Sequence, residues 1–165
     1  MKEILIEKVT LNIGAGEGGQ KLENAKTLLE RISGRTAIKT LSKIRNPVFH
    51  IKKGDPIGVK VTLRGELASE VLKKCLKANE NKIRKKAIDR NGNFAFGVRE
   101  YIDYPGIKYD PNIGIIGFDV CVTLRRKGSR VMKRRIKKTK IGKKQRVTKD
   151  ETMQFIKDKL KIELV

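Results

Sequence analysis

The sequence predicts an α+β fold, in which a mostly antiparallel sheet of about five strands carries helices on one face. Strand-like segments alternate apolar and polar residues, as strands with one buried and one open face do, whereas buried parallel strands form continuous apolar runs. Other segments repeat apolar residues at helical spacing. The 165 residues suffice for one core, so a single domain over 1–165 is expected.

The first expected strand covers residues 8–13, and the first expected helix covers residues 20–33. The apolar members of this strand are Val9, Leu11 and Ile13. The helix stripe consists of Leu22, Ala25, Leu29 and Ile32. Gly34 stands where a glycine C-cap is typical, so the helix is expected to end there. A weaker strand is expected over 36–44.

A second strand and helix pair is expected over residues 57–64 and 66–78. The inward members of the strand are Ile57, Val59, Val61 and Leu63. Cys75 falls on the apolar stripe of the helix, so we interpret it as a small core residue.

The second half of the chain continues with a turn at 89–93, a short strand near 95–102 and an alternating strand over 117–125. The inward members of the last strand are Phe118, Val120, Val122 and Leu124. Thr148 and Glu151 form a capping box, which predicts a final helix after them.

The polar members of the strands are expected to share one open face of the sheet. They are Lys8, Thr10, Asn12, Lys60, Thr62, Arg64, Thr123 and Arg125. This set contains four cations, no aromatic side chain and, apart from Asp119 at its edge, no carboxylate. Because single-strand readers stack bases on aromatic side chains, this face is expected to grip the backbone and shape of folded RNA. An ordinary solvated sheet face is the alternative.

The chain has 40 Lys and Arg residues against 18 Asp and Glu residues, a net charge of +22. A surplus of this size repels itself in a compact state, so it indicates a polyanionic partner. Nucleic acid is the first candidate and an anionic membrane surface the second. The most basic segment lacks a continuous apolar helical face, which disfavours the membrane.

Residues 125–147, which we call the basic arm, hold 13 basic residues and no acidic residue. Such a segment is expected to be extended and mobile when unbound, and to lie along phosphates when bound. A solvated linker is the alternative. The candidate phosphate contacts are Arg125, Arg126, Arg130, Lys133, Arg134, Arg135, Lys137 and Lys138.

The sequence disfavours several other classes of protein. No apolar run approaches the roughly 20 residues that span a bilayer, and Glu3 and Glu7 interrupt the N-terminal apolar segment, so no signal peptide is visible. Cys75 and Cys121 are interpreted as reduced thiols of a cytoplasmic protein. His50 is the one histidine, so neither a zinc site nor histidine catalysis is expected.

Gly14, Gly16 and Gly19 match the pattern G-x-G-x-x-G between an expected strand and an expected helix, the setting of a dinucleotide-binding loop. Such a site also needs a parallel βαβ unit and an acidic residue about 20 positions on, where this chain offers Lys39 and Lys43. A nucleotide-binding enzyme is therefore the less favoured alternative, and no cofactor or small-molecule substrate is expected. Glycine also allows another chain to approach closely.

Four stretches resemble one family: LNIGAGEGG, KKGDPIGVKVTLRGE, DRNGNFAFGVREYIDYPGIKYDPNIGIIGFDVCVTL and RVMKRRIKKTKIGKKQRVTKDE. They cover well over half of the chain and follow the order of the large-subunit ribosomal protein L-five family, which binds 5S rRNA. The basic segment before the final helix and the short N-terminus are similar to the archaeal form.

The resemblance implies a non-enzymatic protein of the central protuberance. Its implied partners are 5S rRNA, large-subunit rRNA, peptidyl-site tRNA, a small-subunit head protein and neighbouring large-subunit proteins. By the resemblance, the 5S rRNA surface includes Asn12, Gly14, Gly16, Lys39, Thr40, Lys43, Thr62 and Arg64. The implied tRNA-contact loop comprises Phe49, His50, Ile51, Lys52, Lys53 and Gly54. The chain departs from the family pattern at Gly106, Lys127 and Ser129, in expected loops, which bears on local contacts and not on the fold.

Overall fold

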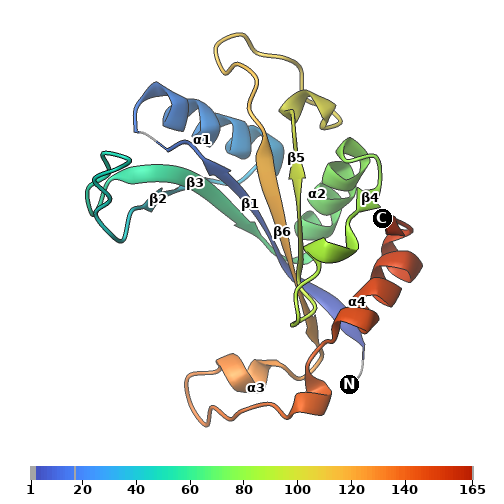
Figure 1. Cartoon of the computed structure of the whole chain (residues 1–165). Helices are drawn as coiled ribbons and strands as arrows, with labels where there is room; N and C mark the ends of the chain where they lie inside the picture. The colour runs from blue at the N-terminus through green and yellow to red at the C-terminus, as the bar shows by residue number, and fades with distance from the viewer. Residues whose placement is uncertain (1–2, 17, 165) are drawn as a thin grey trace.

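The structure, a computed structural model of the chain, describes residues 3–16 and 18–164. Its centre is a five-stranded sheet in the order β2-β3-β1-β6-β5, and every neighbouring pair of strands is antiparallel (Figure 1). The α+β fold and the antiparallel sheet expected from the sequence are therefore confirmed. The strands are β1 (Ile4–Gly14), β2 (Ile38–Leu41), β3 (Pro56–Leu63), β5 (Phe94–Val98) and β6 (Phe118–Arg126).

The register brings the inward residues of the three central strands side by side. Val9 of β1 stands opposite Leu63 of β3 and Val122 of β6, and all three side chains are buried. Because successive side chains of a strand alternate between the two faces, Leu11 and Ile13 follow Val9 into the core. The alternation in the sequence thus identified the covered face of the sheet.

Helices α1 (Gln20–Ser33) and α2 (Gly65–Ala78) pack their apolar stripes against this inward face (Figure 1). Gly34 ends α1 with a φ of 62°, and its N–H donates to Glu30 O, so the predicted glycine C-cap is confirmed. Cys75 of α2 is fully buried, and burial raises the pKa of its thiol to about 12. It is a core side chain, as expected.

Helix α4 (Lys149–Phe155) begins with the predicted capping box between Thr148 and Glu151 and continues as the π-helical turn η4 (Ile156–Leu160). It packs on the turn at residues 89–93, where Thr152 Oγ1 donates to Gly92 O at 2.9 Å. This contact ties the C-terminal helix to the side of the sheet that ends with β5.

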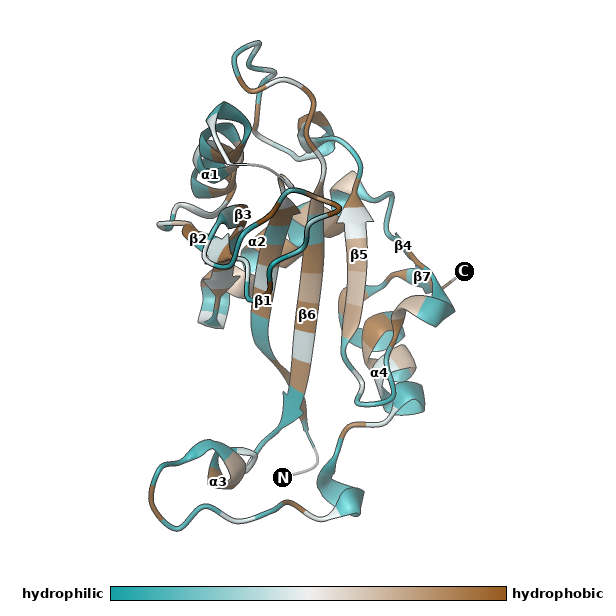
Figure 2. Ribbon diagram, turned by 60° about the vertical axis from the view of Figure 1, so that its left-hand side comes forward, coloured by the Kyte–Doolittle hydropathy of each residue, from teal (hydrophilic) through white to brown (hydrophobic). Residues whose placement is uncertain are grey.

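A second, two-stranded sheet pairs β4 (Lys82–Ile83) with β7 (Glu163–Leu164) in parallel, beside β5 in Figure 2. Two residues are too few for alternation to reveal, so the sequence did not predict these strands. Short 3-10 helices, η1 (Lys85–Ala87) and η2 (Tyr101–Asp103), flank β5. Among the residues described, no helix is long and apolar enough to cross a membrane.

The basic arm leaves the sheet at the end where β1 begins and β6 ends (Figures 1 and 2). It contains α3 (Arg130–Lys133) and η3 (Lys143–Gln145). Its two limbs contact each other, since Gln145 Nε2 donates to Lys127 O and Thr139 N–H donates to Val131 O. The structure therefore shows a returning loop where the sequence predicted an extended segment, because polar groups of one limb bind the other.

Candidate nucleic-acid interface

The face of the sheet opposite α1 and α2, which we call the open face, carries the polar residues of the central strands. Asn12 of β1 stands opposite Lys60 of β3 and Asp119 of β6. The preceding outward residue of β1, Thr10, stands opposite Thr62. The strand residues that the structure brings together here are Lys8, Thr10, Asn12, Lys60, Thr62, Thr123 and Arg125. Arg64 extends the set directly after β3.

The cations of the open face have no ion-pair partner among the described residues, although the Asp119 carboxylate lies on the same face. Lys8, Lys60, Arg64 and Arg125 form no ion pair with any residue of 3–16 or 18–164. Glu7, at the irregularity of β1 between Ile6 and Lys8, is instead paired with a lysine of the basic arm. Cations without internal partners are suited to neutralise phosphates.

The open face has no aromatic side chain for stacking. Phe94 and Phe96 of β5 stand opposite Val122 and Val120, so both phenylalanines lie on the helix side. Gly97, which follows Phe96 in the strand, lies on the open face and has no side chain. Single-strand readers stack bases on sheet aromatics, so this face is instead suited to grip backbone and shape.

At one end of the open face, two neighbouring strand positions are glycines and carry no side chain. We call this pair, Gly14 and Gly58, the glycine floor. Gly14 of β1 and Gly58 of β3 stand opposite each other, next to Asn12 and Lys60. A Cβ on Gly58 would lie 2.8 Å from Ile13 O and 2.9 Å from Thr40 Oγ1, so the fold itself requires glycine there. A Cβ on Gly14 would meet no heavy atom within 4 Å. Gly14 therefore leaves open space in front of the sheet.

The glycine loop is not part of a dinucleotide-binding unit. Both neighbours of β1 are antiparallel, and β2, the strand after α1, pairs with β3. The parallel βαβ unit that such a site needs is absent from this sheet, which overturns the alternative of a nucleotide-binding enzyme. The N–H groups of Ala15 and Gly16 both donate to Ile57 O at 3.0 Å. These amides therefore hold the loop against β3.

The three expected contacts of the second strand are split between the two sides of the sheet. Lys39 stands opposite Val59 and forms an ion pair with Glu23 of α1, so it lies on the helix side. The hydrogen bond from Lys39 holds the pKa of the Glu23 carboxyl below its usual value. Thr40 lies on the open face over Gly58, and Lys43 follows β2 as an exposed side chain.

Residues 42–55 form a hairpin-like loop between β2 and β3, at the left of Figure 1. Asn46 and Ile51 exchange both backbone hydrogen bonds, and His50 takes a φ of 53° at the turn. Large apolar side chains of this loop are exposed: Ile44 (77%), Val48 (80%) and Phe49 (67%). Lys52 and Lys53 flank them, also exposed. The loop thus presents an apolar tip with positive charge.

Arg126 differs from the other cations expected to contact phosphates. Its side chain is 8% exposed, its Nη2 is paired with Glu151 of α4, and its Nη1 donates to Lys144 O at 3.3 Å. The hydrogen bond from Arg126 lowers the pKa of the Glu151 carboxyl. Arg126 therefore joins the base of the arm to α4 instead of facing a partner, because the structure supplies a carboxylate from 25 residues further along the chain.

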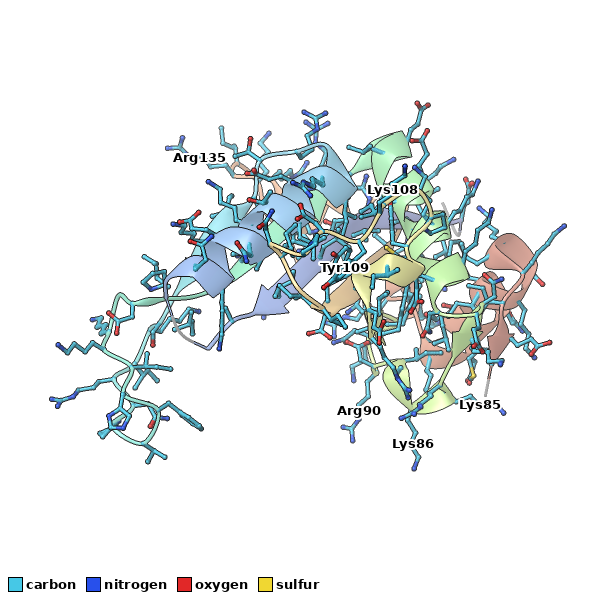
Figure 3. All side chains as sticks on the ribbon, turned by 90° about the horizontal axis from the view of Figure 1, so that it is seen from above. Lys85, Lys86, Arg90, Lys108, Tyr109 and Arg135 are labelled. Carbon is cyan, nitrogen blue, oxygen red and sulfur yellow. The ribbon has the colours of Figure 1, made fainter. Side chains whose placement is uncertain are left out.

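The remaining cations of the arm are exposed. Lys133 is paired with Glu7, and Arg134 Nε donates to Lys137 O at 2.8 Å. Neither of these last two side chains forms an ion pair with the part of the chain described here, and the same holds for Arg125, Arg130, Arg135 and Lys138. Figure 3 shows Arg135 pointing away from the body of the molecule.

Two features of the candidate interface escaped the sequence prediction. Gly58 occupies an outward strand position, and glycine inside an alternating strand is a signal for close backbone approach. Ile44 and Val48 lie in a loop flanked by cations, a pattern visible in SKIRNPVFHIKKG. No group of three or more potential metal ligands occurs among the described residues.

Comparison with known proteins identifies the family of the chain. Residues 1–52 match the family model of ribosomal protein L5, and residues 56–155 match that of the ribosomal L5P family C-terminus. The protein of Nanoarchaeum equitans called large ribosomal subunit protein uL5 is 48% identical over 166 residues, which cover 100% of this chain and 98% of that protein.

Two further proteins of the same name show a similar likeness. The protein of Methanococcoides burtonii is 47% identical over 164 residues, which cover 99% of this chain and 97% of that protein. That of Methanosphaera stadtmanae is 46% identical over 162 residues, which cover 98% and 96%. The chain therefore belongs to the ribosomal protein L5 family, a family of structural proteins of the large ribosomal subunit and not of enzymes.

Proposed function

We propose that the open face binds 5S rRNA and so holds that RNA in the central protuberance of the large subunit. The observation that carries this proposal is the combination of four unpaired cations with a glycine floor and no aromatic side chain. Lys and Arg side chains release counterions from phosphates, and Thr10, Asn12 and Thr62 fix the register through hydrogen bonds. Such a surface suits the sugar–phosphate edge of helical RNA.

The basic arm is proposed to bind large-subunit rRNA. It projects from the end of the sheet, and its exposed cations include Arg130, Arg135 and Lys138 (Figure 1). Its contacts with the body, through Arg126, Lys127 and Lys133, fix where the arm begins and leave the other cations for phosphates.

The loop of residues 42–55 is proposed to contact the tRNA in the peptidyl site through Phe49 to Gly54. Support comes from its protrusion beyond the sheet and from an exposed aromatic, Phe49, next to Lys52 and Lys53. An exposed ring can stack or pack on a nucleotide while the lysines meet phosphates. A small-subunit head protein and neighbouring large-subunit proteins complete the proposed partners, on the strength of the family resemblance.

The 5S rRNA proposal is tested by the salt dependence of binding. Each cation that contacts a phosphate contributes about one to the slope of log K against log salt. We expect Lys60→Gln and Arg125→Gln each to lower this slope by about 1, measured by filter retention of transcribed 5S rRNA. Lys73→Gln on α2 is the matched control, since it removes the same charge from the helix side. Equal slopes in all three variants contradict the proposal.

A further inference from the structure

One edge of the sheet is an open strand beside a groove. β5 pairs with β6 on one side; on its other side the structure describes one isolated bridge, between Ile88 and Phe94, and no ladder. A groove of about 870 Å³ runs along this side, between β5 and the segment made by the end of α2, β4 and η1. None of the RNA contacts proposed above uses this groove.

The backbone of β5 directs hydrogen-bonding groups into the groove. Asp89 N–H donates to Asn93 O, so the N–H and C=O of Asn93 face away from β6. Alternate residues of an antiparallel strand face the same side, which places the N–H and C=O of Gly97 on the groove side as well. Apart from the pairing of β5 with β6, the N–H and C=O groups of Gly97 form no backbone hydrogen bond with a described residue. An unpaired edge of this kind is a template for another strand.

The walls of the groove are partly apolar. Phe96 and Val98 line it from β5, and Ile83 and Ala87 line it from the opposite segment. Phe96 is half-buried, so part of its ring remains available to a side chain that enters the groove. An added strand would therefore find apolar contacts for the side chains that point inward.

The rim of the groove is cationic. Lys82 is paired with Glu80 at 2.7 Å, whereas Arg84 and Arg99 are exposed and form no ion pair within the described residues. Asp103 is the other carboxylate of the lining, so the two arginines leave a positive surplus. Lys85 and Lys86 follow Arg84 and point outward from the body (Figure 3). This charge fits a partner that carries carboxylates.

We propose that the groove docks an extended segment of another protein, which adds a strand to β5 and places carboxylates beside Arg84 and Arg99. A peptide in the extended conformation presents N–H donors and C=O acceptors at the spacing of a strand. The C=O of Gly97 can accept from such a donor, and its N–H can donate to such an acceptor. An RNA backbone offers phosphate acceptors and one 2′-OH donor per nucleotide, which does not reproduce the paired N–H and C=O groups of a strand edge. The edge chemistry thus selects protein over RNA, and the inference goes beyond RNA binding without resting on it.

The test uses the full chain, labelled with ¹⁵N, and a capped peptide of about eight alternating Glu and Val residues, the length of an ordinary strand. We expect saturable shifts of the amide signals along β5, and hydrogen exchange of the Gly97 amide slowed at least about fivefold. The double variant R84E/R99E is expected to bind the peptide about tenfold more weakly, since both charge-assisted contacts are lost.

Two controls separate strand addition from other kinds of binding. A peptide with the same side chains and N-methylated amides is expected not to slow exchange at Gly97, because it cannot donate to the edge. The variant K21E/K73E, with the same charge change on α1 and α2, is expected to bind as the wild type does, and the amide spectrum of each unbound variant checks its folding. The proposal is overturned by unslowed Gly97 exchange, by equal binding of the methylated peptide, or by equal weakening in both double variants. It is also overturned if a short single-stranded RNA protects Gly97 as well as the peptide does.

Discussion

Gly14 and Gly58 face each other on the open face, yet they are glycines for different reasons. Any side chain at position 58 collides with Ile13 O and Thr40 Oγ1, so the fold excludes it. A Cβ at position 14 meets no heavy atom within 4 Å. Packing within the described chain therefore does not require glycine at position 14, and the proposed approach of RNA to the sheet would account for it.

This difference gives a test at one residue. We expect Gly14→Val to unfold at nearly the wild-type temperature and to weaken 5S rRNA binding by about 1–2 kcal/mol, since two methyl groups would separate the RNA from the strand. Thermal unfolding and filter binding measure the two effects. Thr27→Val on the exposed side of α1 is the control, with both properties expected to stay unchanged. Undiminished binding by Gly14→Val would show that RNA does not reach this floor.

Arg126 and Glu151 give a pH dependence to the base of the arm. The hydrogen bond from Arg126 lowers the folded-state pKa of Glu151 below its ordinary 4.5, so this carboxylate stabilises the fold above that value. The contribution is lost as the pH falls through the lowered pKa. We expect the wild type to lose stability more steeply than Glu151→Gln as the pH falls from about 5, in urea unfolding. Parallel curves for the two proteins contradict this role.

Among the elements, the basic arm is a surface loop that contributes no buried residue between positions 128 and 146. None of residues 128–146 is buried, whereas Arg126 and Val147 on either side are. We expect deletion of 128–146 to leave cooperative thermal unfolding intact and to reduce incorporation into ribosomes, because the exposed cations are lost while the core is kept. Calorimetry and sedimentation of ribosomal particles check both. Loss of the cooperative transition would place the arm in the core.

The elements that the sequence predicted are those whose signal is local. Alternation over six or more residues located β1, β3 and β6, and helical spacing located α1 and α2. The capping box located the start of α4, because its two residues lie three apart in the chain. The two-residue strands β4 and β7 carry no such pattern, and neither does the return of the arm on itself.

The alternation of polar and apolar residues along a strand predicts which side chains share a face of the sheet, and this part of the candidate interface was predictable. It placed Thr10, Asn12, Lys60 and Thr62 together, as the register confirms. It could not show that Arg126 is buried against Glu151, because that pairing is set by the tertiary packing of α4. For the same reason, the pairing of Lys39 with Glu23 across the edge of the sheet had no sequence signal.

At the scale of the whole molecule, the open face lies between two projections. The glycine floor and the loop of residues 42–55 stand at the end of the sheet where β1 finishes, and the basic arm stands at the end where β1 begins (Figures 1 and 2). Helices α1 and α2 cover the opposite face of the sheet. An RNA held on the open face would therefore leave the loop and the arm to reach partners beyond either end.

We propose that the open face, and not positive charge in general, binds 5S rRNA. The most direct test of this proposal is filter binding of 5S rRNA by Thr62→Glu and Arg64→Glu, with Lys73→Glu on α2 as the control. We expect Thr62→Glu and Arg64→Glu each to lose at least about 1 kcal/mol of binding free energy, the scale of a charge-assisted hydrogen bond, and we expect the control to bind nearly as the wild type does. Unchanged binding in both open-face variants, or an equal loss in the control, would contradict it.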